Sequence, residues 1–219
     1  MTTRRSVLGA TAGAGLALNL AGLAQLLAAD AVKRGVHRVA GDARVNGRPV
    51  TAGMQIRPGD SVVTGANGDI VFVVGRDAFM LRADSRIELE GRAGSVLLTG
   101  LRIVTGRILS VFAPGARKKL QTDTATMGIR GTGIYVEAER DRSYVCTCYG
   151  TVDIVSRADP AVRETVQTTH HDQPRYVLAR GAPQMLMGAP VINHTDAELI
   201  LIESLVGRTP PFGSVPYRY

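Results

Sequence analysis

The feature that most restricts the fold of this chain is the regular recurrence of turn residues between about residues 35 and 155. Asn46-Gly47 is typical of a two-residue hairpin, because both residues tolerate a positive φ angle. Residues 58–60 (Pro-Gly-Asp) and 65–68 (Gly-Ala-Asn-Gly) mark the next turns. Turns spaced about eight to twelve residues apart, with no long helical period between them, indicate an all-β domain.

Apolar and polar residues alternate between these turns. In residues 86–90, Ile87 and Leu89 fall on one side of the expected strand and the charged residues on the other. Further strands are expected at residues 69–74, 101–104, 107–112, 133–139 and 143–156. Strands this short and evenly spaced suit a roll, a β-helix or a β-sandwich, and the period of two does not choose among them.

The C-terminal region has a different pattern. Thr195 and Glu198 have the spacing of a capping box, so Thr195 is the expected N-cap of a helix over residues 196–206. Gly207 and the prolines at 210–211 end it. One face of this helix would carry the apolar side chains Leu199, Ile202, Leu205 and Val206. We expect this stripe to dock on the sheet, with binding to a partner protein as the alternative.

The first 31 residues predict the compartment. Arg4 and Arg5 precede an uncharged, apolar stretch over residues 7–29, which is typical of a twin-arginine export signal. A stretch of about 20 apolar residues could also anchor the protein in a bilayer. Residues 29–31 (Ala-Asp-Ala) have the form of a cleavage site, and residues 22–24 are a second candidate. We therefore expect a periplasmic protein, held at the inner membrane if the signal is not cleaved.

The basic charge does not indicate a nucleic-acid partner. The formal net charge is +7, but the arginines are scattered singly and tryptophan is absent. Nucleic-acid-binding surfaces usually cluster basic residues with aromatic ones, so we expect no such partner. The sequence also lacks a Gly-x-Ser-x-Gly elbow, a phosphate-binding glycine loop and a His-Glu-x-x-His helix. We expect a binding module rather than an enzyme, with a signal at 1–31, a β domain at 32–158 and a C-terminal extension at 159–219.

The residues best suited to chemistry are two cysteines and two histidines. Cys146 and Cys148 are the only cysteines, and in a strand both side chains project from the same face. His170 and His171 follow a polar stretch at residues 157–169, which we interpret as a long loop able to fold back onto that strand. Two thiolates with one or two imidazoles would form a tetrahedral site for zinc or copper. Asp172 would then orient the coordinating imidazole.

Other interpretations of these four residues stay open. The cysteines could be buried, unreactive thiols, since free cysteine is often found in cores. They could also form a disulfide in an oxidising compartment, although two cysteines two positions apart on a flat strand lie near the upper limit of bridging distance. The histidines could be surface residues beside a turn at Pro174.

Several segments, in the order in which they occur, resemble the FecR domain family. They are Gly59-Asp60 before residues 62–65, the expected strand at 68–72, and the run from Thr126 to Thr132, followed by a strand at 134–136. The Arg-Gly-Thr triplet within that run is the most specific piece. The resemblance covers roughly residues 45–155, which is about half of the chain.

This resemblance implies a periplasmic all-β domain shaped as an elongated, twisted roll. In the best-known members, the domain receives a signal from an outer-membrane iron transporter and passes it to a cytoplasmic segment that holds a sigma factor. Only five residues precede the apolar segment here, so we expect no sigma-regulating role. We expect a periplasmic module that recognises an envelope protein or a small ligand. A small metal-binding or redox protein and a cell-envelope scaffold are the alternatives.

The family motif also has a physical interpretation. Gly128 and Gly131 permit a positive φ angle or a close approach of the backbone. Arg130, between them, can donate several hydrogen bonds, and Thr132 completes the motif. We expect Arg130 to be buried and to hold a tight crossover in place, with an anion-binding site as the alternative.

Overall fold

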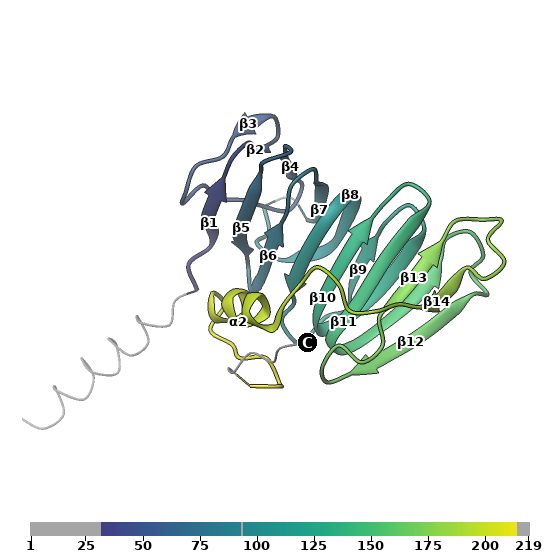
Figure 1. Ribbon diagram of the computed structural model, residues 1–219. Helices are drawn as coiled ribbons and strands as arrows, with labels where there is room; N and C mark the ends of the chain where they lie inside the picture. The colour runs from purple at the N-terminus through teal and green to yellow at the C-terminus, as the bar shows by residue number, and fades with distance from the viewer. Residues whose placement is uncertain (1–31, 93, 214–219) are drawn as a thin grey trace, which may run out of the picture. The chain divides into compact units, whose positions relative to one another are not determined.

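Strands dominate the computed structural model, which describes residues 32–92 and 94–213 (Figure 1). The first half of the domain contains β1 (Gly35–Ala40), β2 (Ala43–Val45), β3 (Arg48–Pro49), β4 (Ser61–Thr64), β5 (Asp69–Val74), β6 (Asp77–Leu81) and β7 (Arg86–Gly91). The second half contains β8 (Leu98–Val111), β9 (Lys118–Gln121), β10 (Ala125–Ala138), β11 (Arg142–Ser156), β12 (Arg163–Thr168), β13 (Arg175–Leu178), β14 (Leu186–Gly188) and the helix α2 (Asp196–Ser204). The all-β expectation, with one short C-terminal helix, is therefore confirmed.

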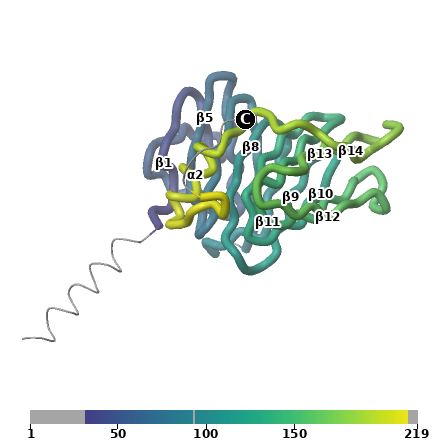
Figure 2. The backbone as a smooth tube through the Cα atoms, turned by 60° about the horizontal axis from the view of Figure 1, so that its bottom comes forward, coloured from purple at the N-terminus to yellow at the C-terminus, as the bar shows by residue number. Residues whose placement is uncertain are grey.

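The strands form one large, open sheet. Its main path runs β14-β13-β11-β10-β9-β8-β7-β4-β2-β3, and β1, β5 and β6 branch from it through the pairing of β6 with β8. The neighbours pair in antiparallel fashion apart from β8 and β9, which are parallel. The long strands β8, β10 and β11 connect the two ends of the sheet, so that β1 and β14 lie far apart (Figure 2).

The hairpin turn predicted at Asn46-Gly47 is confirmed. Asn46 and Gly47 have φ angles of 51° and 78°, which are the positive values that a tight hairpin needs, and they join β2 to β3. This turn places Ala43 and Val45 on the buried side and Arg44 on the exposed side.

The sheet has two faces with different contents. The apolar face is filled by aliphatic and aromatic side chains that include Ile70, Phe72, Phe79, Leu81, Ile103, Ile108, Ile134, Val136 and Val152. The second, helix-covered face packs against α2 and carries Val71, Val73, Ala78, Met80, Leu109, Val111, Tyr135, Tyr144, Cys146, Cys148 and Tyr149. Because side chains alternate along a strand, Val145 of β11 faces the apolar side while Tyr144 and Cys146 face the helix.

Helix α2 begins and docks as the sequence predicts. The Thr195 hydroxyl accepts a hydrogen bond from the Glu198 N–H, and the Glu198 carboxylate accepts one from the Thr195 N–H, which completes the capping box. Leu199 and Ile202 are fully buried against the sheet. The regular helix ends at Ser204, before the predicted boundary, because the following residues close it as a turn.

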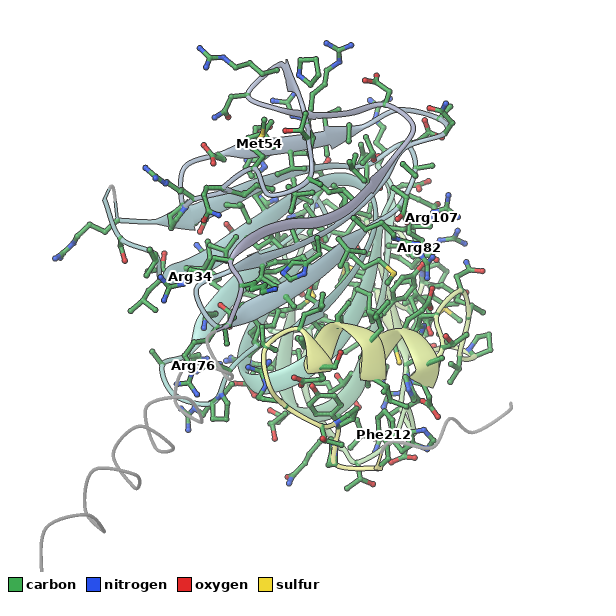
Figure 3. All side chains as sticks on the ribbon, turned by 90° about the vertical axis from the view of Figure 1, so that its left-hand side faces the viewer. Arg34, Met54, Arg76, Arg82, Arg107 and Phe212 are labelled. Carbon is green, nitrogen blue, oxygen red and sulfur yellow. The ribbon has the colours of Figure 1, made fainter. Side chains whose placement is uncertain are left out.

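A charged contact fixes the start of α2 on the sheet. Arg82, just after β6, places its Nη2 2.8 Å from Glu198 Oε1 and donates to the Asn193 carbonyl at 3.0 Å. Figure 3 shows Arg82 at one end of α2 and Phe212 beside it. Arg82 therefore holds both the first turn of α2 and the segment before it.

The predicted loop over residues 157–169 is wrong in its second half. Residues 163–168 form β12, which pairs with β11 from Gly150–Thr168 to Val155–Arg163. Only Val166 and Thr168 of this strand are buried, so its polar exposed face concealed the alternation. The region after residue 158 continues the same sheet, and the residues from 32 onward form one compact unit.

Arg130 is exposed, which corrects the expectation of a buried arginine. The register of β10 against β11 shifts between Arg130 and Gly133, and Gly131 within this bulge has a φ angle of 58°. Thr132 is the buried member of the motif, and its hydroxyl lies 3.1 Å from the Arg130 carbonyl and 3.2 Å from that of Thr151. Gly128 leaves room for Arg117, since an added Cβ would lie 2.5 Å from its guanidinium.

The predicted export signal, with Arg4 and Arg5, lies outside the described residues. In the part of the chain that the structure describes, no helix has the length and apolar character needed to cross a membrane.

Candidate metal centre

Strand β11 brings the two thiols to the same side of the sheet. Cys146 and Cys148 are 1% and 0% exposed, and both belong to the helix-covered face, as the spacing predicts. Both are free thiols. Cys146 and Cys148 are therefore not joined by a disulfide.

His171 reaches these thiols because the chain turns sharply after β12. Its φ angle is 52°, and its N–H donates to the Cys148 carbonyl at 3.0 Å, which fixes this turn against β11. The ring is buried, and Nδ1 lies 3.4 Å from the Cys146 sulfur.

His194 completes the group from the segment that precedes α2. Its ring stacks on Tyr135 with a centroid distance of 4.5 Å, and its Nε2 lies 3.0 Å from Nδ1 of His171. The sequence analysis missed His194, which is more than twenty residues from the other members and has no recognisable spacing to them. Its position just before the capping box, which fixes the start of α2, was the one available signal.

The four donor atoms lie within 4.8 Å of one another, and all four residues are buried. In a tetrahedral zinc site, bonds of about 2.3 Å to sulfur and about 2.0–2.1 Å to nitrogen place the donors about 3.3–3.8 Å apart. The distance between the two ring nitrogens, 3.0 Å, lies just below that range, and the distance from Nδ1 of His171 to the Cys146 sulfur, 3.4 Å, lies within it. The group thus has the size as well as the composition of a Cys2His2 site.

The hydrogen-bond partners assign the protonation of both rings. Nδ1 of His194 lies 2.6 Å from the Ile192 carbonyl, which can only accept, so the proton of the neutral ring is on Nδ1. Nε2 of His171 lies 3.1 Å from an Asp196 carboxylate oxygen, so its proton is on Nε2. The other two ring nitrogens, Nδ1 of His171 and Nε2 of His194, lie 3.0 Å apart, and Nδ1 of His171 lies 3.4 Å from the Cys146 sulfur.

Asp196 takes the orienting role that we expected of Asp172. Asp196 is the first residue of α2, is fully buried and contacts both His170 and His171. Asp172 is exposed and accepts a hydrogen bond from the Thr168 hydroxyl at 2.7 Å. Carboxylates that hold the far nitrogen of a ligating imidazole are common around metal sites.

His170 stands beside the cluster rather than in it. Its Nε2 lies 2.9 and 3.0 Å from the two oxygens of Asp196, and its side chain is 23% exposed. His170, His171 and Asp196 form a second group of potential ligands that shares His171 with the first. Three of the four predicted residues, Cys146, Cys148 and His171, belong to the four-residue group. The fourth, His170, is adjacent to that group through Asp196.

The electrostatics favour a cation at this position. A hydrogen bond with the Cys148 thiol, together with His171 and His194, holds the pKa of Cys146 well below its usual range despite burial. Burial raises the pKa of Cys148, and the neighbouring Cys146 raises it further. The Cys146 thiol therefore loses its proton more readily than the Cys148 thiol.

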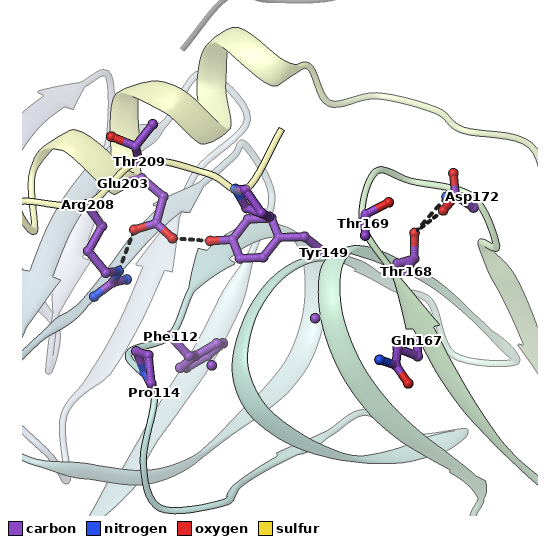
Figure 4. A pocket seen from close by; sticks show the side chains of 13 residues that line it. Phe112, Pro114, Tyr149, Gln167, Thr168, Thr169, Asp172, Glu203, Arg208 and Thr209 are labelled. Carbon is purple, nitrogen blue, oxygen red and sulfur yellow. Dashed lines mark hydrogen bonds and ion pairs between the residues drawn. The ribbon is translucent and has the colours of Figure 1, made fainter. Parts of the chain in front are cut away.

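A cavity of about 610 Å³ adjoins the cluster. One wall is formed by Tyr149, whose hydroxyl donates to Glu203, and by Arg208, whose Nε donates to the same carboxylate at 2.6 Å (Figure 4). The opposite wall carries Thr168 and Asp172. Gly131 of the family motif lines the same cavity.

Comparison with known proteins supports the fold alone. No family model and no curated protein matches the sequence. One solved structure from Parabacteroides distasonis, described as a "putative anti-sigma factor", matches with a TM-score of 0.50 at 9% identity, over 65% of this chain and 64% of that one. A second structure of the same description and organism has a TM-score of 0.48 at 11% identity, over 59% and 58%.

The first of these structures shows that the sheet has a fold related to that of the anti-sigma-factor proteins. This agrees with the FecR-like resemblance at the level of fold. The chain spans less than two thirds of the length of either structure.

Proposed function

We propose that this protein is a FecR-like binding module built around a buried zinc site, with Cys146, Cys148, His171 and His194 as the four ligands. One observation carries the proposal: Nδ1 of His171 and Nε2 of His194 lie 3.0 Å apart, and these two nitrogens and the two buried sulfurs all lie within 4.8 Å of one another. Two sulfurs and two ring nitrogens that converge in this way are the donor set of a closed zinc site.

The role of the metal ion would be structural. A set of four protein ligands leaves no open position for water or substrate, as in closed zinc sites. The ligands come from β11, from the turn after β12 and from the segment before α2, so the ion would cross-link three parts of the chain. This supports a binding module rather than an enzyme.

Zinc is preferred to copper because two imidazoles and two thiolates in a tetrahedral arrangement are typical of zinc. The test is elemental analysis of the protein purified from its native compartment. We expect about one zinc ion per chain in the wild type and none in a variant with Cys146→Ser and Cys148→Ser. His37→Ala, which removes the histidine that belongs to neither group of potential ligands, is the matched control and should keep the metal. Wild-type protein without stoichiometric metal would refute the proposal.

We further propose that the module recognises a small ligand in the cavity beside Tyr149, or an envelope protein that inserts a side chain there. The cavity volume of about 610 Å³ is within the usual range for small-molecule sites, and hydrogen bonds fix the polar groups of Tyr149, Glu203 and Arg208 in its wall. A fragment library screened by ligand-observed NMR tests this. Thr169→Trp should fill the cavity and remove binding, whereas Gln184→Trp, at an exposed site outside it, should not. Fragments that bind both variants equally would refute a site in this cavity.

The proposed location is the periplasm, reached by the twin-arginine route. That route carries folded proteins, so the metal ion could be inserted before export. Replacement of Arg4 and Arg5 by lysine should keep the precursor in the cytoplasm, and mature protein in the periplasm of that variant would contradict the route.

A further inference from the structure

We infer that His170 and Asp196 form the port through which the metal ion reaches and leaves the buried site. This inference rests on the proposed metal function and adds a route to it. It gives a role to the second group of potential ligands, which the four-ligand site does not use.

The burial of the four ligands makes such a route necessary. Cys146, Cys148, His171 and His194 are 1%, 0%, 2% and 5% exposed. A hydrated ion cannot contact any of them from solution without a donor that replaces its water on the way. His170, with 23% of its side chain exposed, is the one histidine next to the site that solvent reaches.

A continuous series of donor atoms connects His170 to the thiols. Nε2 of His170 lies 2.9 Å from Asp196 Oδ2, and Asp196 Oδ1 lies 3.1 Å from Nε2 of His171. Nδ1 on the opposite edge of the same ring lies 3.4 Å from the Cys146 sulfur. Nε2 of His171 carries the proton that Asp196 accepts, so an ion that leaves the Asp196 carboxylate passes beside the His171 ring to reach Nδ1 and the thiols.

The chemistry of the transfer is ligand exchange. The aqua ion forms bonds to His170 Nε2 and to the Asp196 carboxylate as water molecules leave it, and the ring proton moves through water from Nε2 to Nδ1, so that the imidazole coordinates in its neutral form. These two bonds then break as bonds to the four inner donors form. The protons held within the thiol and imidazole group return to water by the same path, and no oxidation state changes.

Phe212 covers the port. Its ring lies 4.5 Å from that of His170 and 6.1 Å from that of His171, between centroids. It also contacts Tyr149, at 6.2 Å. Figure 3 shows Phe212 below α2. Removal of this ring should open the port, while removal of His170 should withdraw its first donor.

The two substitutions therefore predict opposite kinetic effects. With Zn²⁺ as the probe, His170→Ala should lower the rate constants of uptake and of chelator-driven release, each by about tenfold or more. Phe212→Ala should raise both. Since uptake and release change together, the ratio that sets affinity should change much less than either rate. Stopped-flow measurements with a zinc indicator for uptake and with EDTA for release give these constants.

The controls separate the port from the site. His37→Ala should leave both rate constants at the wild-type values, and thermal melting of the zinc-loaded variants confirms that they fold. Wild-type rates in His170→Ala would overturn the port while leaving the metal site intact. Loss of affinity in His170→Ala without a change in uptake would also overturn it, because His170 would then be a ligand or a support. A wild-type protein that binds no zinc would refute the metal site itself.

Discussion

The two faces of this sheet differ in the chemical character of their buried side chains. The core of the apolar face is hydrophobic, and the buried ion pair that adjoins it is that of Asp77 with Lys118, which lies over the Phe112 ring. The helix-covered face has a denser group of buried titratable residues on it or against it, including Cys146, Cys148, His171, His194, Asp196 and Glu203. Buried polar groups cost free energy unless they are hydrogen-bonded or coordinate an ion. The difference is what the proposed metal site predicts: the apolar face stabilises the fold, and the helix-covered face holds the buried groups that would bind the ion.

The largest effect is expected from the apolar face. Phe79 is fully buried and stacks on Phe72 at 5.0 Å and against Phe112 at 5.6 Å. Phe79→Ala should lower the free energy of unfolding by about 3–5 kcal/mol, through the cavity that it leaves. Denaturant unfolding with and without chelator measures this loss. It should be the same in both conditions, and a loss that depended on metal would contradict the separation of the two faces.

Substitutions on the helix-covered face should instead change how the free energy of unfolding depends on zinc. Zinc that binds only the folded state stabilises it by about 2.7 kcal/mol when the free ion is at 100 times its Kd. His194→Ala, which removes a ligand, should abolish this gain and leave unfolding insensitive to added zinc. Thermal melting at a series of buffered zinc concentrations gives the slope. A His194→Ala protein that still gains stability with zinc would place the ion elsewhere.

A smaller effect on zinc binding is expected at Asp196, which contacts the ligand His171. Asp196→Asn keeps the shape of the side chain but removes the charge that holds Nε2 of His171. We expect zinc affinity to fall by about 10- to 100-fold, as is usual when such a partner is changed. Asp172→Asn is the matched control at an exposed carboxylate, and competition with a zinc indicator measures both. Equal losses in the two variants would contradict the role of Asp196.

The smallest effect is expected at the family motif. Arg130 is exposed at a bulge of β10, so Arg130→Ala should change the free energy of unfolding by less than about 0.5 kcal/mol. Urea unfolding would show this. A loss of several kcal/mol would restore the buried arginine that the sequence alone suggested.

Local signals predicted much of this fold. The hairpin at Asn46-Gly47 and the capping box at Thr195 depend on a few neighbouring residues, and both are confirmed. Strand β12 was missed because one of its faces is solvent-exposed and polar, so its composition matched a loop. Arg130 was misplaced because it alternates with the buried Ile129 on β10, so its side chain lies on the exposed side of the strand, and the register shift comes only after it.

The candidate site was predictable to the extent that it lies on one strand. Cys146 and Cys148 share a face by the period of two, and this followed from the sequence. The choice of His171 over His170 depended on a positive φ angle at His171, and the inclusion of His194 depended on where α2 docks. Both are consequences of tertiary packing, for which the sequence offers no spacing rule.

The most direct test of the account is X-ray absorption at the zinc edge on the natively purified protein. We expect a first shell of two sulfur atoms at about 2.3 Å and two nitrogen atoms at about 2.0–2.1 Å. The sulfur contribution should vanish in the variant with Cys146→Ser and Cys148→Ser. A shell of nitrogen and oxygen alone in the wild type would contradict the central claim, because it would place the ion away from the thiols of β11.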